Sequence, residues 1–154
     1  MNADEIARGL SPFQPENVAI QACKIMLSRI EELLIRHVDF AIETTLTTKS
    51  YLITIKRAQQ IGYKVTLLFF WLNDVELAIE RVAVRVQEGG HYIPEEVIRR
   101  RYKKGIENVN SFIAICDYWM LIDNSLGIME FIAEGNFNKE KSIFVKESWI
   151  KLFD

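Results

Sequence analysis

The run from Tyr63 to Leu72 constrains the fold of this 154-residue chain more than any other stretch. Apart from one lysine and one threonine it is nearly all apolar, and a strand that is apolar on both faces is typical of a buried parallel sheet. Helix signals flank the run. Gly62 ends a helix before it, and Asn73 with Glu76 forms a capping-box-like pair that begins a helix after it.

Helices and strands are expected to alternate along the rest of the chain. Glycine and proline residues predict that residues 1–15 are irregular. A long helix is predicted from near Glu16, because apolar residues recur there at three- and four-residue steps and would form its buried face: Ile20, Cys23, Leu27, Ile30 and Leu34. Further helices are predicted from Thr47 to Gly62, Asn73 to Gly89, Pro94 to about Ile113, and roughly Lys139 to Lys151. Strands are predicted at Val38–Glu43, Tyr63–Leu72, Cys116–Ile122 and Ile128–Ala133, the last pair forming a hairpin around Gly127. This order predicts an α/β sheet with right-handed crossovers.

The composition excludes several classes of protein. With 49% hydrophobic and 26% charged residues the chain is neither a disordered tail nor a disulfide scaffold, and a net charge of −2 gives no reason to expect nucleic-acid binding. The start resembles no signal peptide, and no apolar run approaches the roughly 20 residues that cross a bilayer. We therefore expect a cytoplasmic protein without membrane contact, in which Cys23 and Cys116 are reduced core residues and no metal site is present.

Polar residues follow each predicted strand, where ligands bind in open α/β sheets. Glu43, Thr44 and Thr45 follow the first strand, and a carboxylate beside two hydroxyl groups can orient a hydroxyl of a sugar or nucleotide. A capped loop with a solvated glutamate is the alternative. Two further groups follow the later strands, at Asn73–Asp74 and at Asp123–Ser125.

The stretch from Arg81 to Lys104 is locally basic. Arg81 and Arg85 lie one helical turn apart. Between Arg85 and Lys104 the sequence contains six basic residues and three glutamates, which gives a local net charge of +3. Two helices joined at Gly89-Gly90 can close over a ligand as a lid, and converging arginines suit phosphoryl oxygens. The alternative is a solvated helix face with ordinary surface salt bridges. His91, beside the glycine pair, more commonly bridges locally than catalyses.

Taken in order, several segments resemble zeta-toxin-like P-loop kinases, and the resemblance covers nearly the whole chain. They include an E-T-T-L motif and a segment similar to the family's lid. The matching segments are Asn2–Pro12, Phe40–Leu46, Gly62–Val65, Trp71–Leu72, Glu76–Val82, Gly89–His91, Ile93–Pro94, Arg99–Tyr102 and Asp123–Ser125. The resemblance implies a single three-layer kinase-like domain over residues 1–154, with a lid at about 81–104.

The resemblance also implies an activity. This is ATP- and Mg²⁺-dependent phosphorylation of a hydroxyl on a small substrate, with UDP-N-acetylglucosamine as the candidate, and an antitoxin protein as partner. By position, Asp4 resembles the general base, and Glu43, Thr44 and Thr45 resemble the substrate-binding element. Arg81 resembles a phosphate-contacting arginine, with Arg85 as a second candidate. His91 falls where some members carry a lid arginine, so Arg100 or Arg101 is expected to supply that charge.

One departure from the family concerns the front of the domain. Members have a first strand and a G-x-x-G-x-G-K-[ST] loop that binds nucleotide phosphates, and none of the seven glycines here begins such a pattern. We therefore expect a truncated kinase domain that is inactive alone, marginally stable and prone to aggregation. The alternative is a non-catalytic kinase remnant that binds a partner protein. Nucleic-acid binding is a distant third interpretation.

Overall fold

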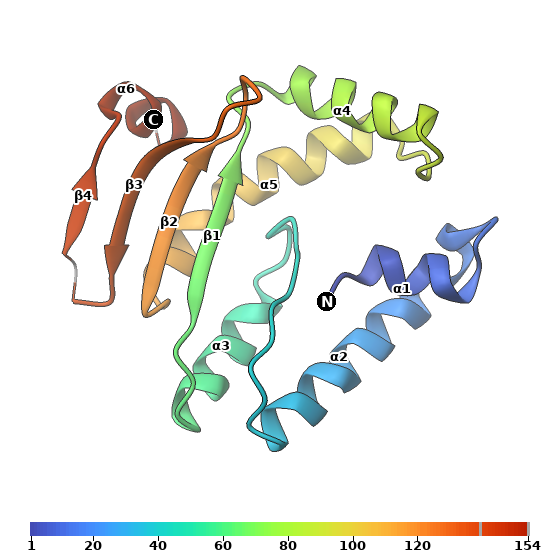
Figure 1. Ribbon diagram of the computed structural model, residues 1–154, viewed down its shortest axis with the longest axis horizontal. Helices are drawn as coiled ribbons and strands as arrows, with labels where there is room; N and C mark the ends of the chain where they lie inside the picture. Colours follow the sequence, from blue (N-terminus) through green and yellow to red (C-terminus); the bar gives the residue numbers. More distant parts are fainter. Residues whose placement is uncertain (139, 154) are drawn as a thin grey trace. The chain divides into compact units, whose positions relative to one another are not determined.

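The computed structural model describes residues 1–138 and 140–153 (Figure 1). The chain divides into two compact units, Met1–Thr44 and Thr45–Asp154, and each is described by itself below. The expectation of a single domain over 1–154, with its lid, stays a prediction.

The first unit begins with a helix that the sequence analysis missed. Helix α1 spans Ala3–Leu10, so the prediction that residues 1–15 are irregular was wrong. Asn2 caps this helix, because its side-chain oxygen accepts a hydrogen bond from the Asp4 backbone N–H, and Asp4 and Glu5 complement the positive end of the helix dipole. The short 3₁₀ helix η1 follows at Pro15–Val18.

The predicted long helix is present as α2, at Ala19–Ile35, but a different face of it is buried. Ile30 and Leu34 are buried as expected, whereas Ile20, Cys23 and Leu27 are exposed. The buried stripe comprises Ala22, Met26, Ile30, Leu33 and Leu34. Both stripes have three- and four-residue spacing, and helix α1 packs against α2, so spacing alone could not choose between them.

Residues Val38–Glu43 do not form the predicted strand. The segment contacts the start of the chain, where Glu43 N–H donates to Met1 O at 2.9 Å and the Met1 amino group donates to Ala41 O. A strand is defined by a ladder to its neighbours. Among the described residues this segment has no ladder partner, although its apolar residues favour a strand.

The described residues of the second unit form one four-stranded mixed sheet, and the predicted α/β fold class is confirmed. Strands β1 (Thr66–Trp71), β2 (Tyr118–Asp123), β3 (Glu130–Asn136) and β4 (Lys141–Ile143) lie in the order β1-β2-β3-β4. β1 and β2 are parallel, whereas β2–β3 and β3–β4 are antiparallel. The hairpin predicted around Gly127 is therefore present, and this glycine has a φ of 76°.

Helices join the strands largely as predicted. Helix α3 (Ser50–Gln60) is followed by Gly62 at a φ of 96°, as expected, although Thr48 rather than Thr47 accepts at its start. Helix α4 spans Val75–Gln87 and is capped by Asp74, one residue beyond the predicted Asn73. Helix α5 spans Glu95–Ile113 after Pro94.

The prediction for the end of the chain was wrong in part. Strand β4 occupies the beginning of the predicted last helix, and helix α6 spans only Lys146–Phe153; Lys139 lies outside the described residues. The helix prediction takes Ile143, Trp149 and Ile150 as its core anchors, and of these Ile143 and Trp149 pack against the core. Ile150 is exposed, however, and Leu152 is the buried anchor.

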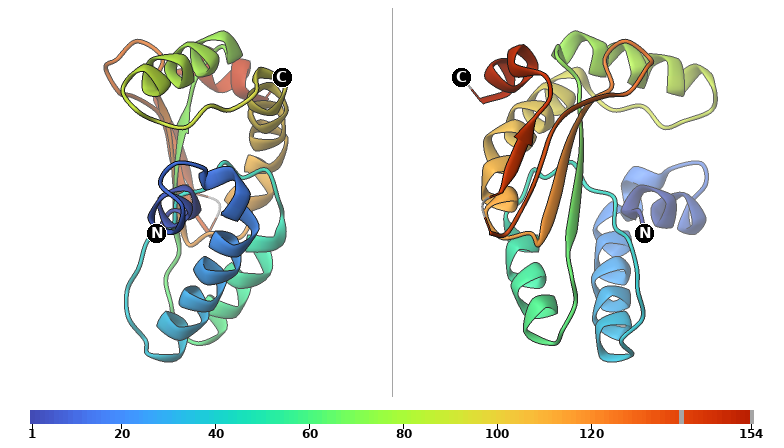
Figure 2. Two further views of the ribbon diagram at one scale, coloured as in Figure 1. Left: turned by 90° about the vertical axis from the view of Figure 1, so that its right-hand side faces the viewer. Right: turned by 60° about the vertical axis from the view of Figure 1, so that its left-hand side comes forward.

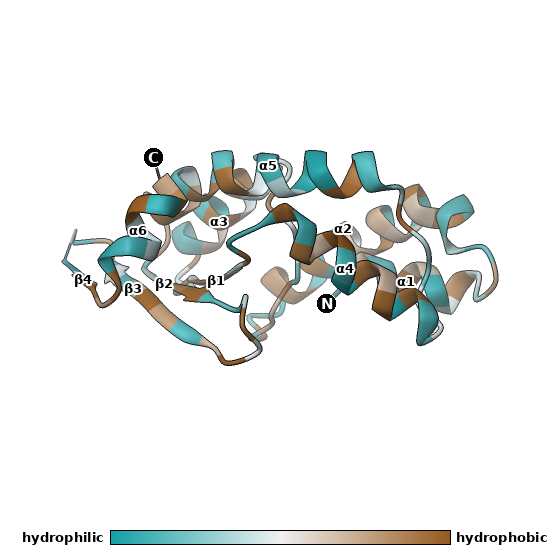
Figure 3. Cartoon of the chain, turned by 90° about the horizontal axis from the view of Figure 1, so that it is seen from above, coloured by the Kyte–Doolittle hydropathy of each residue, from teal (hydrophilic) through white to brown (hydrophobic). Residues whose placement is uncertain are grey.

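The core of the second unit lies on one face of its sheet. Helix α5 runs along that face in the edge-on views of Figure 2, and α3 and α6 add apolar side chains to the same cluster. The outward side of α5 is largely hydrophilic in Figure 3. The buried members of the cluster are Leu46, Trp71, Val109, Phe112, Trp119, Leu121, Ile132, Ala133 and Leu152. Cys116 is buried as predicted, but Cys23 is exposed, so its assignment to the core was wrong; both cysteines are free.

Candidate functional site

In the first unit, Asn2 connects two of the predicted site residues. Its Oδ1 atom accepts a hydrogen bond from the Asp4 backbone N–H at 2.8 Å. Its Nδ2 atom donates to Glu43 Oε2, also at 2.8 Å. One amide side chain therefore places Glu43 beside the first turn of helix α1, where Asp4 lies with its side chain exposed.

Asp4 and Glu43 thus lie in one small region that is open to solvent. The backbone bond from Glu43 N–H to Met1 O, at 2.9 Å, fixes the main chain beneath the Glu43 side chain. Glu43 and Thr44 are both exposed. Carboxylates in such a position are hydrogen-bond acceptors, which suits contact with a hydroxyl group.

The next residues of the E-T-T-L motif belong to the second unit, and they are anchored in its core. Leu46 has a left-handed backbone with a φ of 54° while its side chain is buried, an arrangement that costs energy in a residue with a Cβ. The buried Asn108 of α5 donates to Leu46 O at 2.7 Å. Gly105 allows this close approach, because a Cβ there would lie 2.7 Å from Thr45 O. Thr45 is therefore positioned by α5.

A polar network covers the carboxyl ends of β1 and β2. Asn73 N–H donates to Ser125 Oγ at 2.8 Å, and the Ser125 hydroxyl donates to Asp123. Asn124 N–H donates to Trp71 O at 2.9 Å. These residues are the ones that the sequence places after the two strands, and the structure brings them together. Their polar groups largely satisfy one another, which indicates a rigid edge.

Arg81 and Tyr102 bring helices α4 and α5 to this edge. The Arg81 guanidinium donates to Asn124 O, so the predicted phosphate-contacting arginine lies at the carboxyl end of β2. The Tyr102 hydroxyl donates to Leu72 O at 2.7 Å. Burial, together with the charges of Asp74 and Asp123, raises the pKa of Tyr102, so it remains a hydrogen-bond donor at neutral pH.

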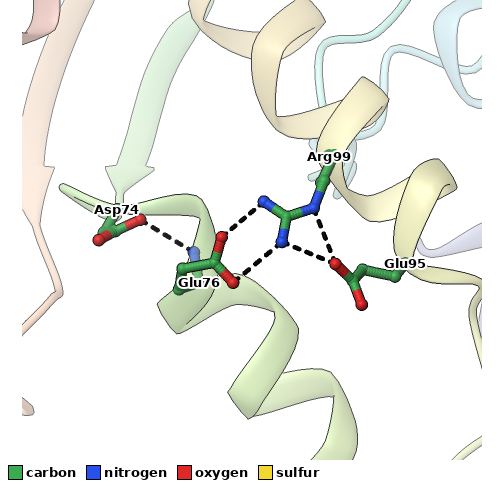
Figure 4. Close-up of polar contacts among 4 residues, drawn as sticks. All are labelled: Asp74, Glu76, Glu95 and Arg99. Atoms are coloured by element: carbon green, nitrogen blue, oxygen red, sulfur yellow. Dashed lines mark hydrogen bonds and ion pairs between the residues drawn. The ribbon is translucent and has the colours of Figure 1, made fainter.

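Arg99 joins the first turns of α4 and α5 (Figure 4). It donates to Glu76 Oε1 and Oε2 at 2.6 and 3.0 Å, in a bidentate pair. It also donates to Glu95 Oε1 from Nε at 2.9 Å and from Nη2 at 2.6 Å. Hydrogen bonds from Arg99 to Glu76 and then Glu95 raise the pKa of Arg99 further, so its guanidinium stays charged. Asp74 accepts from Glu76 N–H at 3.0 Å and fixes the turn that carries Glu76.

The other predicted cations of this helical hairpin differ from Arg99. Arg85 and Arg100 are exposed and Arg101 is half-buried. Within the part of the chain that the structure describes, none of these three arginines has a carboxylate partner within 4.0 Å. His91 is half-buried in the connection that follows Gly89, whose φ is 91°. The hairpin therefore carries three guanidinium groups whose charge is available to an anion.

The site residues thus fall into two groups, one in each unit. Asp4, Glu43 and Thr44 lie in the first unit, and Thr45, Arg81, Arg85, His91, Arg100 and Arg101 lie in the second. Residues 1–138 and 140–153 contain no group of three or more His, Cys, Asp or Glu side chains able to hold a metal ion. No helix among them is long and apolar enough to span a bilayer.

Sequence reasoning missed three residues that organise these groups: Asn2, Arg99 and Asn108. Asn2 carries a detectable signal, because an asparagine followed by two acids is a typical helix start. Arg99 stands in a run of arginines, and nothing in the run distinguishes it from its neighbours. Asn108 bonds to a residue 62 positions away, and no local pattern could reveal that contact.

Comparison with known proteins assigns the family. The family model described as Zeta toxin matches residues 4–122. An uncharacterized protein of Haemophilus influenzae is 30% identical over 102 residues, which cover 66% of this chain and 73% of that protein. No solved structure matches the chain. The chain belongs to the Zeta toxin family, a family of kinase-like proteins with a P-loop NTPase-like fold.

Proposed function

We propose that this chain carries the acceptor site and lid of a phosphotransferase that moves a phosphoryl group from ATP to a hydroxyl of a small substrate. Family membership over residues 4–122 supports a kinase-like activity. The observation that carries the proposal is the bridge through Asn2, which gathers Asp4 and Glu43 in one solvent-open region. A nucleotide sugar such as UDP-N-acetylglucosamine is the proposed substrate class.

In this proposal the two carboxylates have separate roles. Glu43, together with Thr44 and Thr45, binds hydroxyl groups of the substrate. Asp4 accepts the proton of the attacking hydroxyl as its oxygen forms a bond to the γ-phosphorus and the bond to the β,γ-bridging oxygen breaks, leaving ADP. The exposed position of Asp4 gives it access to such a proton.

The phosphate-binding side of the proposal rests on the α4–α5 hairpin. Arg85, Arg100 and Arg101 offer guanidinium groups without carboxylate partners among the described residues, which suits phosphoryl oxygens. Arg81 and His91 complete the proposed set. Bound Mg²⁺ would neutralise part of the negative charge of the nucleotide phosphates. The described residues contain no cluster of three side chains that could hold the ion by themselves. They fit the common arrangement in which Mg²⁺ is bound mainly by water and substrate phosphates.

We further propose that residues 1–154 alone do not turn over ATP. No segment of the sequence matches a phosphate-binding loop, so the backbone N–H groups and lysine that such a loop supplies must come from other polypeptide. The test is titration calorimetry with Mg-ATP on residues 1–154 and on a version extended at its amino end by a family strand–loop–helix unit. Tight binding by the 154-residue form would contradict this proposal.

The role of Asp4 is tested in the extended version. Asp4→Asn is expected to abolish phosphoryl transfer while Mg-ATP binding stays unchanged. The matched control is Glu5→Gln, which removes another exposed carboxylate, paired with Arg8, from the same helical turn and is expected to leave transfer intact. If transfer survives Asp4→Asn, Asp4 is not the base.

A second candidate function is binding of a partner protein without catalysis. Helix α2 favours it, because Ile20 and Ile35 are 76% and 72% exposed. Under the kinase proposal the expected partner is an antitoxin-type protein, the compartment is the cytoplasm, and neither nucleic acid nor membrane is bound. Reading the DNA in frame upstream of Met1 separates the candidates. An encoded glycine-rich loop with its lysine supports the kinase, and an in-frame stop codon supports the binding module.

A further inference from the structure

Asn108 places an amide group inside the apolar face of helix α5. The residue is only 7% exposed, and its helical neighbours Val109 and Phe112 are fully buried apolar residues. Of the residues that the structure describes, Asn108 and Ser125 are the polar ones that are buried. Burying an amide costs free energy unless it is hydrogen-bonded, so an apolar residue would suit this position better if packing were its only task. The asparagine therefore needs a reason beyond packing.

The reason lies in the contact of Asn108 with the E-T-T-L motif. Its Nδ2 atom donates to Leu46 O at 2.7 Å, across 62 positions of sequence. Leu46 has a φ of 54°, in the left-handed region, and its side chain is buried. A residue with a Cβ keeps such a backbone only where its surroundings hold it there, and residues of this kind gather at functional sites. The Asn108 bond fixes the carbonyl group of the strained residue itself.

A second contact with α5 fixes the preceding peptide group. A Cβ at Gly105, one turn before Asn108 on the same face of the helix, would lie 2.7 Å from Thr45 O. The carbonyl groups of Thr45 and Leu46 thus both face α5, one against a glycine and the other bonded to Asn108. Thr45 itself is exposed, and its hydroxyl donates to Thr47 Oγ1 at 3.4 Å. The helix therefore holds the main chain at Thr45 while the side chain stays open to solvent.

We propose that Asn108 is a positioning residue of the acceptor site, which acts through Leu46 to hold Thr45 where its hydroxyl meets a hydroxyl of the substrate. Asn108 itself does not touch the substrate. The inference rests on the proposed function, because that function makes Thr45 part of the substrate-binding element. A buried donor suits the role, since the hydrogen bond to Leu46 O is strengthened by its apolar surroundings.

Helix α5 also gives the position of Thr45 a chemical meaning. The helix is continuous over Glu95–Ile113, and Arg101 precedes Gly105 by one turn on the same side. A proposed phosphate-binding arginine and the anchor of the acceptor motif therefore lie on one rigid element, separated by about 6 Å along its axis. Phosphoryl transfer depends on holding donor and acceptor in a fixed geometry. Asn108 thus ties the acceptor motif to the helix that carries a phosphate-binding group.

The first test measures the binding of UDP-N-acetylglucosamine to residues 1–154 by titration calorimetry. Asn108→Asp keeps the size of the side chain but has no N–H group to donate, and it should raise the dissociation constant about tenfold or more. Asn108→Leu makes the same test without a buried charge. Val109→Ala is the control for lost stability, because it removes buried volume beside Asn108 and should leave the dissociation constant unchanged. Asn110→Ala changes an exposed asparagine of the same helix and should alter neither stability nor binding.

A double-mutant cycle separates positioning from a general loss of structure. If Asn108 acts through Thr45, Asn108→Leu should weaken binding about tenfold in the wild-type background but less than about twofold in a Thr45→Ala background. Equal effects in the two backgrounds would overturn the proposal, because Asn108 would then act elsewhere. It would also be overturned if the Asn108→Leu variant is folded, as verified by circular dichroism, and binds the nucleotide sugar as tightly as the wild type does.

The backbone of Leu46 distinguishes a failure of this inference from a failure of the proposed function. NMR chemical shifts of residues 45–47 report the left-handed conformation of Leu46 in the 154-residue chain without any ligand. We expect Asn108→Leu to lose this conformation and Val109→Ala to keep it. If the wild type does not bind UDP-N-acetylglucosamine, the proposed acceptor is wrong, and the Leu46 signals still decide the role of Asn108. A left-handed Leu46 in the Asn108→Leu variant would show that Asn108 does not position the motif.

Discussion

Asn2 donates a hydrogen bond to Glu43 across 41 positions of sequence, at 2.8 Å, while the same side chain caps helix α1 through the Asp4 N–H. The two contacts use different atoms of one amide, so they can be separated by mutation. An aspartate at position 2 keeps the cap but loses the donor to Glu43, and an alanine loses both.

Asn2→Ala is expected to destabilise the first unit by about 1 kcal/mol through loss of the cap. Asn2→Asp should retain protection of α1 from hydrogen exchange, yet increase exchange at residues 41–43, because two carboxylates then face each other. Hydrogen exchange with mass spectrometry resolves the two segments. Asn17→Ala, which removes only a local bond to Gln14, is the control and should alter neither segment.

Gly105 and Gly9 form a matched pair for testing how α5 contacts the E-T-T-L motif. A Cβ at Gly105 would lie 2.7 Å from Thr45 O, whereas a Cβ at Gly9 would meet nothing within 4 Å. Gly105→Ala should therefore destabilise the protein by about 1–3 kcal/mol. Gly9→Ala should be neutral or stabilise it by up to about 1 kcal/mol, because alanine favours a helix. Urea unfolding measures both, and equal effects would contradict the close approach.

Arg99 is expected to fix the α4–α5 hairpin more than its neighbour Arg100 does. Arg99→Met removes four hydrogen bonds to Glu76 and Glu95, and exchange in residues 88–94 should become faster. Arg100→Met removes a guanidinium of equal charge with no carboxylate partner among the described residues, and should leave the exchange unchanged. Arg99→Lys should restore it only in part, since lysine cannot form the bidentate pair.

Asp117 should make the folding stability of the protein depend on pH. Burial acts to raise the pKa of Asp117, but hydrogen bonds from Gln59, the Val65 N–H and Lys64 outweigh it, and the pKa is lowered overall. A carboxyl whose folded pKa is lowered stabilises the protein above its unfolded pKa, and this contribution is lost as pH falls through the folded value.

Asp117→Asn is therefore expected to cost about 1–3 kcal/mol at pH 7, because the half-buried Gln59 side chain and Val65 N–H lose a charged acceptor. The difference from the wild type should begin to shrink below about pH 4, the ordinary pKa of an aspartate in an unfolded chain, and should disappear below the lowered pKa of the folded state. Urea unfolding at pH 7 and pH 3 provides the comparison. Asp39→Asn serves as the control, since Asp39 is exposed, and a difference at pH 3 as large as that at pH 7 would contradict the assignment.

Local signals predicted most of the second unit. The apolar run at β1, the glycine after α3 and the acids after Pro94 each act within a few residues of the element they define, so the sequence was sufficient there. β4 and the start of α6 were not predictable in this way. The three residues of β4 become a strand because they pair with Ala133–Gly135, and no propensity encodes that pairing.

The residues of the candidate site could be nominated from the sequence, whereas their organisation could not. Family resemblance supplied Asp4 and Glu43, whereas the contact that gathers them depends on Asn2, whose neighbour in space is 41 positions away. The failure at Val38–Glu43 has the same origin. The segment favours a strand by composition, and strand formation also needs a ladder that composition cannot provide.

Position 46 is subject to two demands that no natural amino acid meets together. The core requires a large apolar side chain there, while the φ of 54° favours glycine or asparagine. Leu46→Gly would relax the backbone and empty the core site, and Leu46→Ile would keep the volume but add a branch at Cβ where the backbone tolerates it least. Few amino acids can therefore replace the leucine at the end of the E-T-T-L motif. Random mutagenesis of this chain should recover very few functional replacements at that codon.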